Sequence, residues 1–174
     1  MKVVAFAASS SKNSINKKLV TYAASLLKDA DIEVLDLNDY ELPLFSVDKE
    51  QALGQPDLAK AFLNKIANAD ALIISFAEHN GNYTVAYKNL FDWCSRINRH
   101  VFQGKPLVLL ATSVGAGGAN TVLTMAKNSM PHFGGDVKAS VSVPNFNEHF
   151  DIDSGHIHNK EINTQLLDAI ELLR

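Results

Sequence analysis

The sequence predicts an α/β protein built on a doubly wound parallel sheet, and two patterns along the chain indicate it. Short apolar runs rich in β-branched residues alternate with segments of helical periodicity, which gives five βα units. This alternation is typical of a mostly parallel sheet with helices on both faces. The expected strands are Val3 to Ala7, Ile32 to Leu37, Ala71 to Phe76, Leu107 to Thr112 and Val137 to Val143; the expected helices are Ile15 to Lys28, Leu58 to Asn68, Val85 to Ile97, Ala119 to Met130 and about Ile157 to Leu173.

The five apolar runs differ in a way that indicates their places in the sheet. The first, third and fourth are apolar at nearly every position, which fits central strands buried on both faces. The second run alternates apolar and polar residues, which suits an edge. These features favour a three-layer sheet in the flavodoxin-like order 2-1-3-4-5. The competing Rossmann dinucleotide fold requires a Gly-x-Gly-x-x-Gly turn after the first strand, and residues 8–16 contain no glycine.

Length, charge and cysteine content set the broad class. A chain of 174 residues with 47% hydrophobic residues is expected to form a single domain over residues 1–174. A net charge of -3 argues against nucleic acid or an anionic membrane as a partner. No apolar stretch is long enough for a membrane span. The single cysteine, Cys94, excludes an internal disulfide, so we expect a cytoplasmic protein.

The segment Ala8 to Asn16, between the first strand and the first helix, is rich in hydrogen-bonding side chains. Six of its nine residues carry a hydroxyl or an amide. A strand that opens through such residues into a helix leaves backbone N–H groups directed at one point, at the positive end of the helix dipole. One N-cap needs one such side chain, so the surplus predicts a phosphate site. An ordinary turn with an N-cap is the alternative.

Two other unusual loops are expected at the same edge of the sheet. They are Ala77 to Tyr83 after the third strand and Ser113 to Gly118 after the fourth. Taken alone, each has an ordinary interpretation, because Asn80-Gly81 is a common turn pair and glycines relax a helix entry. Glycines also permit close approach of the backbone to a flat ligand. Together, the three loops predict a site for a phosphate that carries a planar ring.

The first loop resembles that of the NAD(P)H-dependent FMN reductases, a branch of the flavodoxin-like superfamily that includes quinone, azo-dye and chromate reductases. The family pattern reads Gly-Ser-x-Arg-x-x-Ser-x-Asn. Ser9, Ser14 and Asn16 agree with it, whereas Ala8 and Ser11 replace the glycine and the arginine. Lys12 is the candidate to supply part of the missing positive charge.

The second motif carries the stronger resemblance. The family has Pro-Glu-Tyr-Asn-Gly-Ser followed by a helix with Leu-Lys-Asn-x-x-Asp-Trp. The chain has Ala77-Glu-His-Asn-Gly-Asn82 followed by Tyr87-Lys-Asn-Leu-Phe-Asp-Trp93, with the spacing retained. His79 in place of tyrosine and Ala77 in place of proline are the departures. The glycine-rich turn of the family is matched loosely by Ser113, Gly115, Gly117 and Gly118.

The resemblance implies FMN as cofactor and NADPH or NADH as co-substrate. It implies ping-pong hydride transfer from the nicotinamide to the flavin and on to a quinone, an azo compound, a free flavin or a similar small acceptor. Because the flavin carries the chemistry, no catalytic side chain is expected; His79 either covers the ring edge or donates a proton. The implied cofactor-binding residues are Ser9, Ser11, Ser14, Ile15 and Asn16 for the phosphate, and Glu78, His79, Asn80, Gly81, Ser113 and Gly115 around the ring.

Two other functions stay open at this level. One is a one-electron flavodoxin-type carrier, although such carriers tend to be more acidic than the -3 found here. The other is a non-enzymatic module that binds a phosphate-bearing ligand.

The remaining polar clusters have structural interpretations. No metal is expected, because the acidic and histidine residues before the last helix fit a solvated loop. Basic residues at the end of the third predicted helix complement its dipole, and Cys94 is interpreted as packing. These residues are Asp151, Asp153, His156 and His158 in the loop, and Arg96, Asn98 and Arg99 at the helix end.

An oligomer is expected on two grounds. Members of the family usually pair through helices that flank the flavin, and apolar residues in this part of the chain exceed the need of one amphipathic face. These residues are Phe91, Trp93, Met125, Met130 and Phe133. We therefore expect a homodimer or a homotetramer. Residues Pro144 to Phe150 are either a lid at the site or an ordered surface loop.

Overall fold

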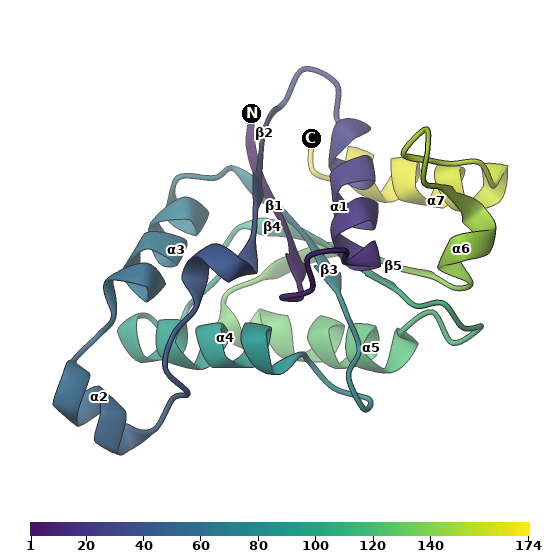
Figure 1. The fold of residues 1–174 in the computed structure, drawn as a ribbon. Coiled ribbons are helices and arrows are strands. Elements are labelled where there is room, and N and C mark those ends of the chain that lie inside the picture. The colour runs from purple at the N-terminus through teal and green to yellow at the C-terminus, as the bar shows by residue number, and fades with distance from the viewer.

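A computed structural model describes all 174 residues and contains a five-stranded parallel sheet in the order β2-β1-β3-β4-β5 (Figure 1). The strands are β1 (Lys2–Ala8), β2 (Asp31–Leu35), β3 (Ala71–Phe76), β4 (Pro106–Thr112) and β5 (Asp136–Val143). The predicted fold class and strand order are confirmed, and the alternating strand β2 lies at an edge of the sheet.

Helices cover both faces of the sheet and make three layers (Figure 1). On one face, α1 (Ile15–Ser25) and α7 (Lys160–Glu171) enclose an apolar cluster with the strands. On the other face, α3 (Asp57–Ala67), α4 (Val85–Ile97) and α5 (Asn120–Ser129) enclose a larger one. The loops that leave β1, β3 and β4 therefore emerge together at the carboxyl edge of the sheet.

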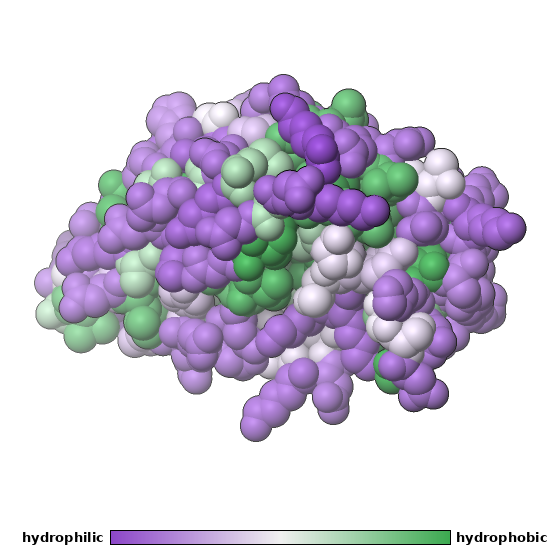
Figure 2. All heavy atoms as spheres, turned by 90° about the horizontal axis from the view of Figure 1, so that it is seen from above, coloured by the Kyte–Doolittle hydropathy of each residue, from purple (hydrophilic) through white to green (hydrophobic).

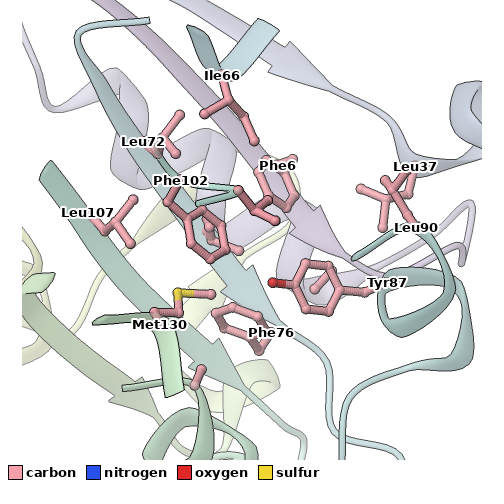
Figure 3. Packing of buried hydrophobic residues seen from close by; sticks show 14 of the residues in the cluster. Phe6, Leu37, Ile66, Leu72, Phe76, Tyr87, Leu90, Phe102, Leu107 and Met130 are labelled. Carbon is pink, nitrogen blue, oxygen red and sulfur yellow. The ribbon is translucent and has the colours of Figure 1, made fainter. Parts of the chain in front are cut away.

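The central strands are buried on both sides, as their continuous apolar sequence indicated. Every residue of β3 is buried, and in β1 alternate side chains enter opposite clusters: Val4 and Phe6 face α3 to α5, whereas Val3 and Ala5 face α1 and α7. Figure 3 shows the larger cluster, in which side chains of β1, β3 and β4 meet those of the covering helices. This packing holds the strand ends that carry the three loops.

Several helices begin at a side-chain cap that is readable in the sequence. Ser14, Thr84 and Asn159 each accept a hydrogen bond from the N–H three residues later, at the starts of α1, α4 and α7. Thr84 also donates to the carbonyl of Ala8 at 3.0 Å and so joins the start of α4 to the end of β1.

The structure differs from the predicted elements in two stretches. Between β2 and α3 it has a 3-10 turn, η1 (Leu37–Tyr40), and a short helix, α2 (Val47–Leu53), which were not predicted. After β5 come α6 (Phe146–His149) and a small antiparallel hairpin of β6 (Phe150–Asp151) and β7 (His156–Ile157). The expected helix from Ile157 is therefore wrong at its start, because Ile157 pairs with Phe150 in the hairpin and Asn159 caps α7.

Figure 2 shows the face that is turned upward in Figure 1. This face is mostly hydrophilic, with smaller apolar patches. No helix in the structure combines the length and the apolar character that crossing a membrane requires.

Candidate functional site

The loop after β1 forms the first wall of the candidate site. Ser9 accepts from the Ser11 N–H at 3.2 Å, and Ser14 caps α1 by accepting from the Lys17 N–H at 3.1 Å. The N–H groups of Ile15 and Asn16 have no intrahelical acceptor, as at any helix N-terminus. Ser11 is exposed, whereas Ser9 and Ser14 are buried at its base. The loop thus presents hydroxyl and amide donors at the positive end of α1.

Asn16 has a structural task that its place in the loop did not reveal. Its side chain is only 2% exposed, and its Oδ1 accepts from the Ser75 hydroxyl at 2.7 Å and from the Thr112 N–H at 3.1 Å. Its Nδ2 donates to the Thr112 carbonyl at 3.1 Å. The amide therefore joins α1 to the ends of β3 and β4, so that only the backbone N–H of Asn16 would be available to a phosphate.

The loop after β3 is a tight hairpin with a two-residue turn. His79 and Asn82 exchange backbone hydrogen bonds of 3.0 and 3.1 Å, and the turn residues Asn80 and Gly81 have φ angles of 54° and 73°. These positive φ values match the type I′ turn that Asn-Gly favours. The turn interpretation of this pair is correct, and the hairpin also exposes His79, Asn80 and Gly81 beside the first loop.

Glu78 connects this hairpin to a helix that the sequence did not link to it. Its Oε2 accepts from the Val122 N–H at 2.8 Å, in the first turn of α5. The carboxylate is half-buried and is already bonded to the protein. Its side chain therefore belongs to the architecture of the loops.

The loop after β4, residues 113–119, uses its glycines in different ways. A Cβ atom on Gly118 would lie 2.3 Å from the Ser142 hydroxyl and 3.0 Å from the Pro144 nitrogen, so packing requires glycine there. A Cβ on Gly115 would meet nothing within 4 Å, which leaves open space beside the loop. The N–H groups of Asn145 and Phe146 donate to the carbonyls of Gly115 and Ser113, each at 3.0 Å. The start of the 144–150 segment thus supports this loop from behind.

The three loops meet around one cavity of about 300 Å³. Its size is at the lower end for small-molecule sites, so a ligand with a large ring would lie partly outside it. The predicted residues Asn80, Gly81 and Gly115 are outside its lining, and Thr112 is a lining residue that the motifs did not indicate. The predicted residues that line it are Ser9, Ser11, Ser14, Ile15, Asn16, Glu78, His79 and Ser113.

No lysine or arginine lines the cavity, and Glu78 is its one acidic residue. Lys17, on the first turn of α1, pairs with Asp36 and holds the pKa of that carboxyl below its usual value. Lys12 is exposed on the loop. An anion in the cavity would therefore be held by hydroxyls, backbone N–H groups and the dipole of α1. This donor set fits a phosphate monoester.

Comparison with known proteins identifies the family. A sequence model of the family described as NADPH-dependent FMN reductase matches residues 1–148. The chain belongs to this family. The matched range contains all three loops and ends within α6.

Two of the curated relatives that the chain matches are named as reductases of quinones. A 2-hydroxy-1,4-benzoquinone reductase of a Burkholderia species is 37% identical over 67% of this chain and 62% of its own length. A quinone reductase of Escherichia coli K12 is 31% identical over 68% of this chain and 64% of its own length. The chain thus matches slightly less than two thirds of either relative.

Solved structures support the same fold. The flavoenzyme NAD(P)H:(acceptor) oxidoreductase FerB of Paracoccus denitrificans superposes with a TM-score of 0.80 at 24% identity, over 99% of this chain and 94% of its own. The apo form of the NADH:FMN oxidoreductase EMOB gives a TM-score of 0.72 at 21% identity, over 99% and 87%. At these identities the likeness concerns the fold.

The family motif on α4 is structural in this chain. Asn89 accepts from the Phe45 N–H at 2.8 Å and donates to the Leu42 carbonyl at 3.1 Å, and the Trp93 indole N–H donates to the Pro43 carbonyl at 2.7 Å. These bonds fix residues 42–45, the anchored segment, against α4. None of the motif residues of α4 lines the cavity.

The other candidate residues have protein partners or lie at the surface. Asp151 accepts from the N–H groups of Asp153 and Ser154 within its own turn. Arg96 pairs with Glu50 at 2.9 Å and holds α2 near α4. Cys94 is buried, and burial raises the pKa of its thiol to about 12. A thiol with such a pKa is not a nucleophile at neutral pH.

Proposed function

We propose that this chain is an NAD(P)H-dependent FMN reductase that passes electrons to a small acceptor such as a quinone, an azo compound or a free flavin. The observation that carries the proposal is the convergence of three loops of a reductase-family chain on one cavity at the N-terminus of α1. The names of the quinone-reducing relatives support the acceptor class.

The donors of the first loop fit the phosphate of FMN. Ser9, Ser11 and Ser14 would hold it together with the first-turn N–H groups of α1, and the helix dipole would compensate part of its charge. The hairpin of residues 79–82 and the loop 113–119 would bound the ring. Since the cavity holds no lysine or arginine, the affinity would depend on hydrogen bonds more than on ion pairs.

The chemistry that FMN supplies when bound is to take up a hydride from a reduced nicotinamide and to release two electrons to an acceptor. The protein would orient the ring, and the N–H groups of the hairpin would stabilise negative charge that gathers on it. His79 is exposed at the rim, where it would cover the ring edge. An open cavity edge suits ping-pong exchange, in which the nicotinamide leaves before the acceptor enters.

A spectrum and a titration test the proposal. The purified chain, incubated with FMN and desalted, should show flavin absorbance or quench FMN fluorescence. Anaerobic NADPH or NADH should then bleach the flavin, and a quinone should restore the colour. Parallel lines in double-reciprocal plots would support the ping-pong scheme. A chain that binds FMN but needs a separate reductase would be a carrier, and one that binds no FMN would overturn the proposal.

We also infer a homodimer or a homotetramer, with a correction to the residues first expected to carry it. Trp93 and Met130 are buried in the core of the single chain and are not available to a partner. Phe91, Met125 and Phe133 are half-buried and line a cavity of about 300 Å³ between α4 and α5, which supports a self-association surface. Light scattering tests this, and a monomer at working concentration would reject it.

We infer a cytoplasmic location from the chemistry of the one cysteine. Cys94 is a buried free thiol and no disulfide stabilises the fold. Fluorescence microscopy of a tagged chain in its own cell tests the inference.

A further inference from the structure

Helix α5 lacks a cap of its own. Ala119, at its N-cap position, has a φ of 56° and no side chain that can accept a hydrogen bond. The N–H of Val122 is the group that an N-cap side chain normally bonds. Here the Glu78 carboxylate takes that place from a loop 44 residues earlier in the chain, at 2.8 Å. A carboxylate is favoured there because the helix dipole is positive at this end.

This bond lies between the two loops that would bound the flavin ring. Glu78 immediately precedes the hairpin, and Val122 lies in the first turn of α5, the helix that follows directly on the loop 113–119. That loop has its own supports on the β5 side, where Ser142 donates to the Gly118 carbonyl at 2.8 Å and Asn145 donates to Gly115. The hairpin closes on itself through His79 and Asn82. The Glu78 to Val122 hydrogen bond is therefore the polar link from one loop to the other.

We propose that Glu78 is a positioning residue that sets the separation of the two ring-binding loops and places a fixed negative charge beside the ring. The inference rests on the proposed FMN function, and it concerns how this chain prepares the site. The binding of any ring between the hairpin and the loop 113–119 would depend on the distance between the two, which neither loop determines alone.

The charge has a separate consequence for the ligand. Glu78 is the one acidic residue that lines the cavity, and no lysine or arginine there offsets it. A fixed negative charge disfavours the gain of electrons by a nearby group. Glu78 should therefore keep the midpoint potential of bound FMN more negative than an uncharged residue would. Hydrogen bonding to Val122 keeps the carboxylate in place, so the effect does not depend on side-chain mobility.

Two substitutions distinguish the effect of the Glu78 to Val122 hydrogen bond from the effect of the carboxylate charge. Glu78→Ala removes both, whereas Glu78→Gln keeps an oxygen of similar reach that can accept from the Val122 N–H but carries no charge. Asn159→Ala is the matched control, because Asn159 accepts from the Ile162 N–H at 3.1 Å and caps α7 away from the cavity. Hydrogen exchange of the chain without FMN, FMN titration by fluorescence and spectroelectrochemistry of the FMN-loaded chain are the measurements.

The expected results differ for each variant. Glu78→Ala should speed amide exchange in both the hairpin and residues 114–122, and should raise the Kd for FMN about tenfold, the loss of one hydrogen bond to a charged group. Glu78→Gln should restore the Kd to within about threefold of the unmodified chain and should make the midpoint potential more positive. Asn159→Ala should leave the Kd and the potential unchanged.

Other results would overturn the proposal. Equal Kd values for Glu78→Ala and Asn159→Ala, or faster exchange in α5 without any change in the hairpin, would show that Glu78 only caps a helix. An unchanged potential in Glu78→Gln would remove the electrostatic role. If the unmodified chain binds no FMN, the proposed function fails, whereas the exchange data still decide whether Glu78 links the two loops.

Discussion

At the cavity and at the anchored segment of residues 42–45, side chains hold distant segments of the chain together by hydrogen bonds to the backbone. The two places differ in how many polar groups are left without a protein partner. In both, a buried or half-buried side chain bonds to backbone groups of a distant segment: Asn16 at the cavity, and Asn89 with Trp93 at the anchored segment. Around the cavity, the first-turn N–H groups of α1 and several hydroxyls face the open space. At the anchored segment, the amide of Asn89 and the indole N–H are already paired.

This contrast shows how to interpret the family motifs. The motif on α4 matches the family pattern closely, and in this structure its polar groups hold the protein together. The first loop matches less closely, yet it leaves donors available. If FMN binds in the cavity as proposed, polar groups without a protein partner indicate its site better than the strength of a motif match does.

The largest expected effect comes from the Asn16 side chain, whose hydrogen bonds join α1 to the ends of β3 and β4 beside the cavity. Asn16→Ala leaves the Ser75 hydroxyl and both backbone groups of Thr112 without their partner in a buried place, which should lower the free energy of unfolding by about 3 kcal/mol. Urea unfolding measures it. Asn13→Ala, an exposed lining residue of the same cavity, should change stability by less than about 0.5 kcal/mol. Similar stabilities for the two variants would contradict the structural role of the Asn16 side chain.

The anchored segment should respond in stability but not in ligand binding. Asn89→Ala removes the partner of the Phe45 N–H and of the Leu42 carbonyl, so we expect a loss of about 2 kcal/mol with an unchanged Kd for FMN. Thermal or urea unfolding and an FMN titration check both parts. Lys88→Ala breaks only an exposed ion pair with Asp92 on the same helix and should change stability by less than about 0.5 kcal/mol. A weaker FMN affinity in Asn89→Ala would place the motif in the binding site.

Two serine caps with the same geometry give the sharpest contrast. Ser14 accepts from the Lys17 N–H at 3.1 Å beside the cavity, and Ser46 accepts from the Lys49 N–H at 3.1 Å at the start of α2. Each alanine variant should lose about 1 kcal/mol of stability. Only Ser14→Ala should also raise the Kd for FMN, by about tenfold. Equal FMN affinities in the two variants would remove Ser14 from the phosphate site.

The last expected effect is absent at neutral pH and appears only at alkaline pH, on the buried side of α4. Burial raises the pKa of the Cys94 thiol from 9.0 to about 12, so the folded chain keeps a proton that the unfolded chain releases. The contribution of the buried, protonated thiol to the free energy of unfolding is fully present below pH 9 and is lost as the pH rises from 9 toward 12. Between pH 9 and pH 10 the unmodified chain should lose about 1 kcal/mol more than Cys94→Ser, whose hydroxyl does not ionise. Parallel stability curves for the two chains would contradict this.

The predictable part of the fold was local. Apolar runs indicate the strands and helical periodicity indicates the helices. The strand β3 (Ala71–Phe76) and the helix α4 (Val85–Ile97) therefore have the bounds that were expected. Residues 146–157 were not predictable in this way. Their short helix and two-residue strands depend on contacts such as the pairing of Phe150 with Ile157, and they have no periodic pattern of their own. Helix α2 likewise exposes its apolar residues Val47 and Leu53 and gives no amphipathic signal.

The sequence by itself determined the five βα units and the three polar or glycine-rich loops, because periodicity and turn chemistry are local properties. It also indicated the strand order, because continuously apolar runs mark strands that are buried on both faces. Only the tertiary structure decided which side chains in those loops stay available. Asn16 meets Thr112 across 96 positions, and Glu78 meets Val122 across 44. Such hydrogen bonds depend on where the sheet brings distant segments together, and the residue type alone does not distinguish a group bonded to the protein from one left for a ligand.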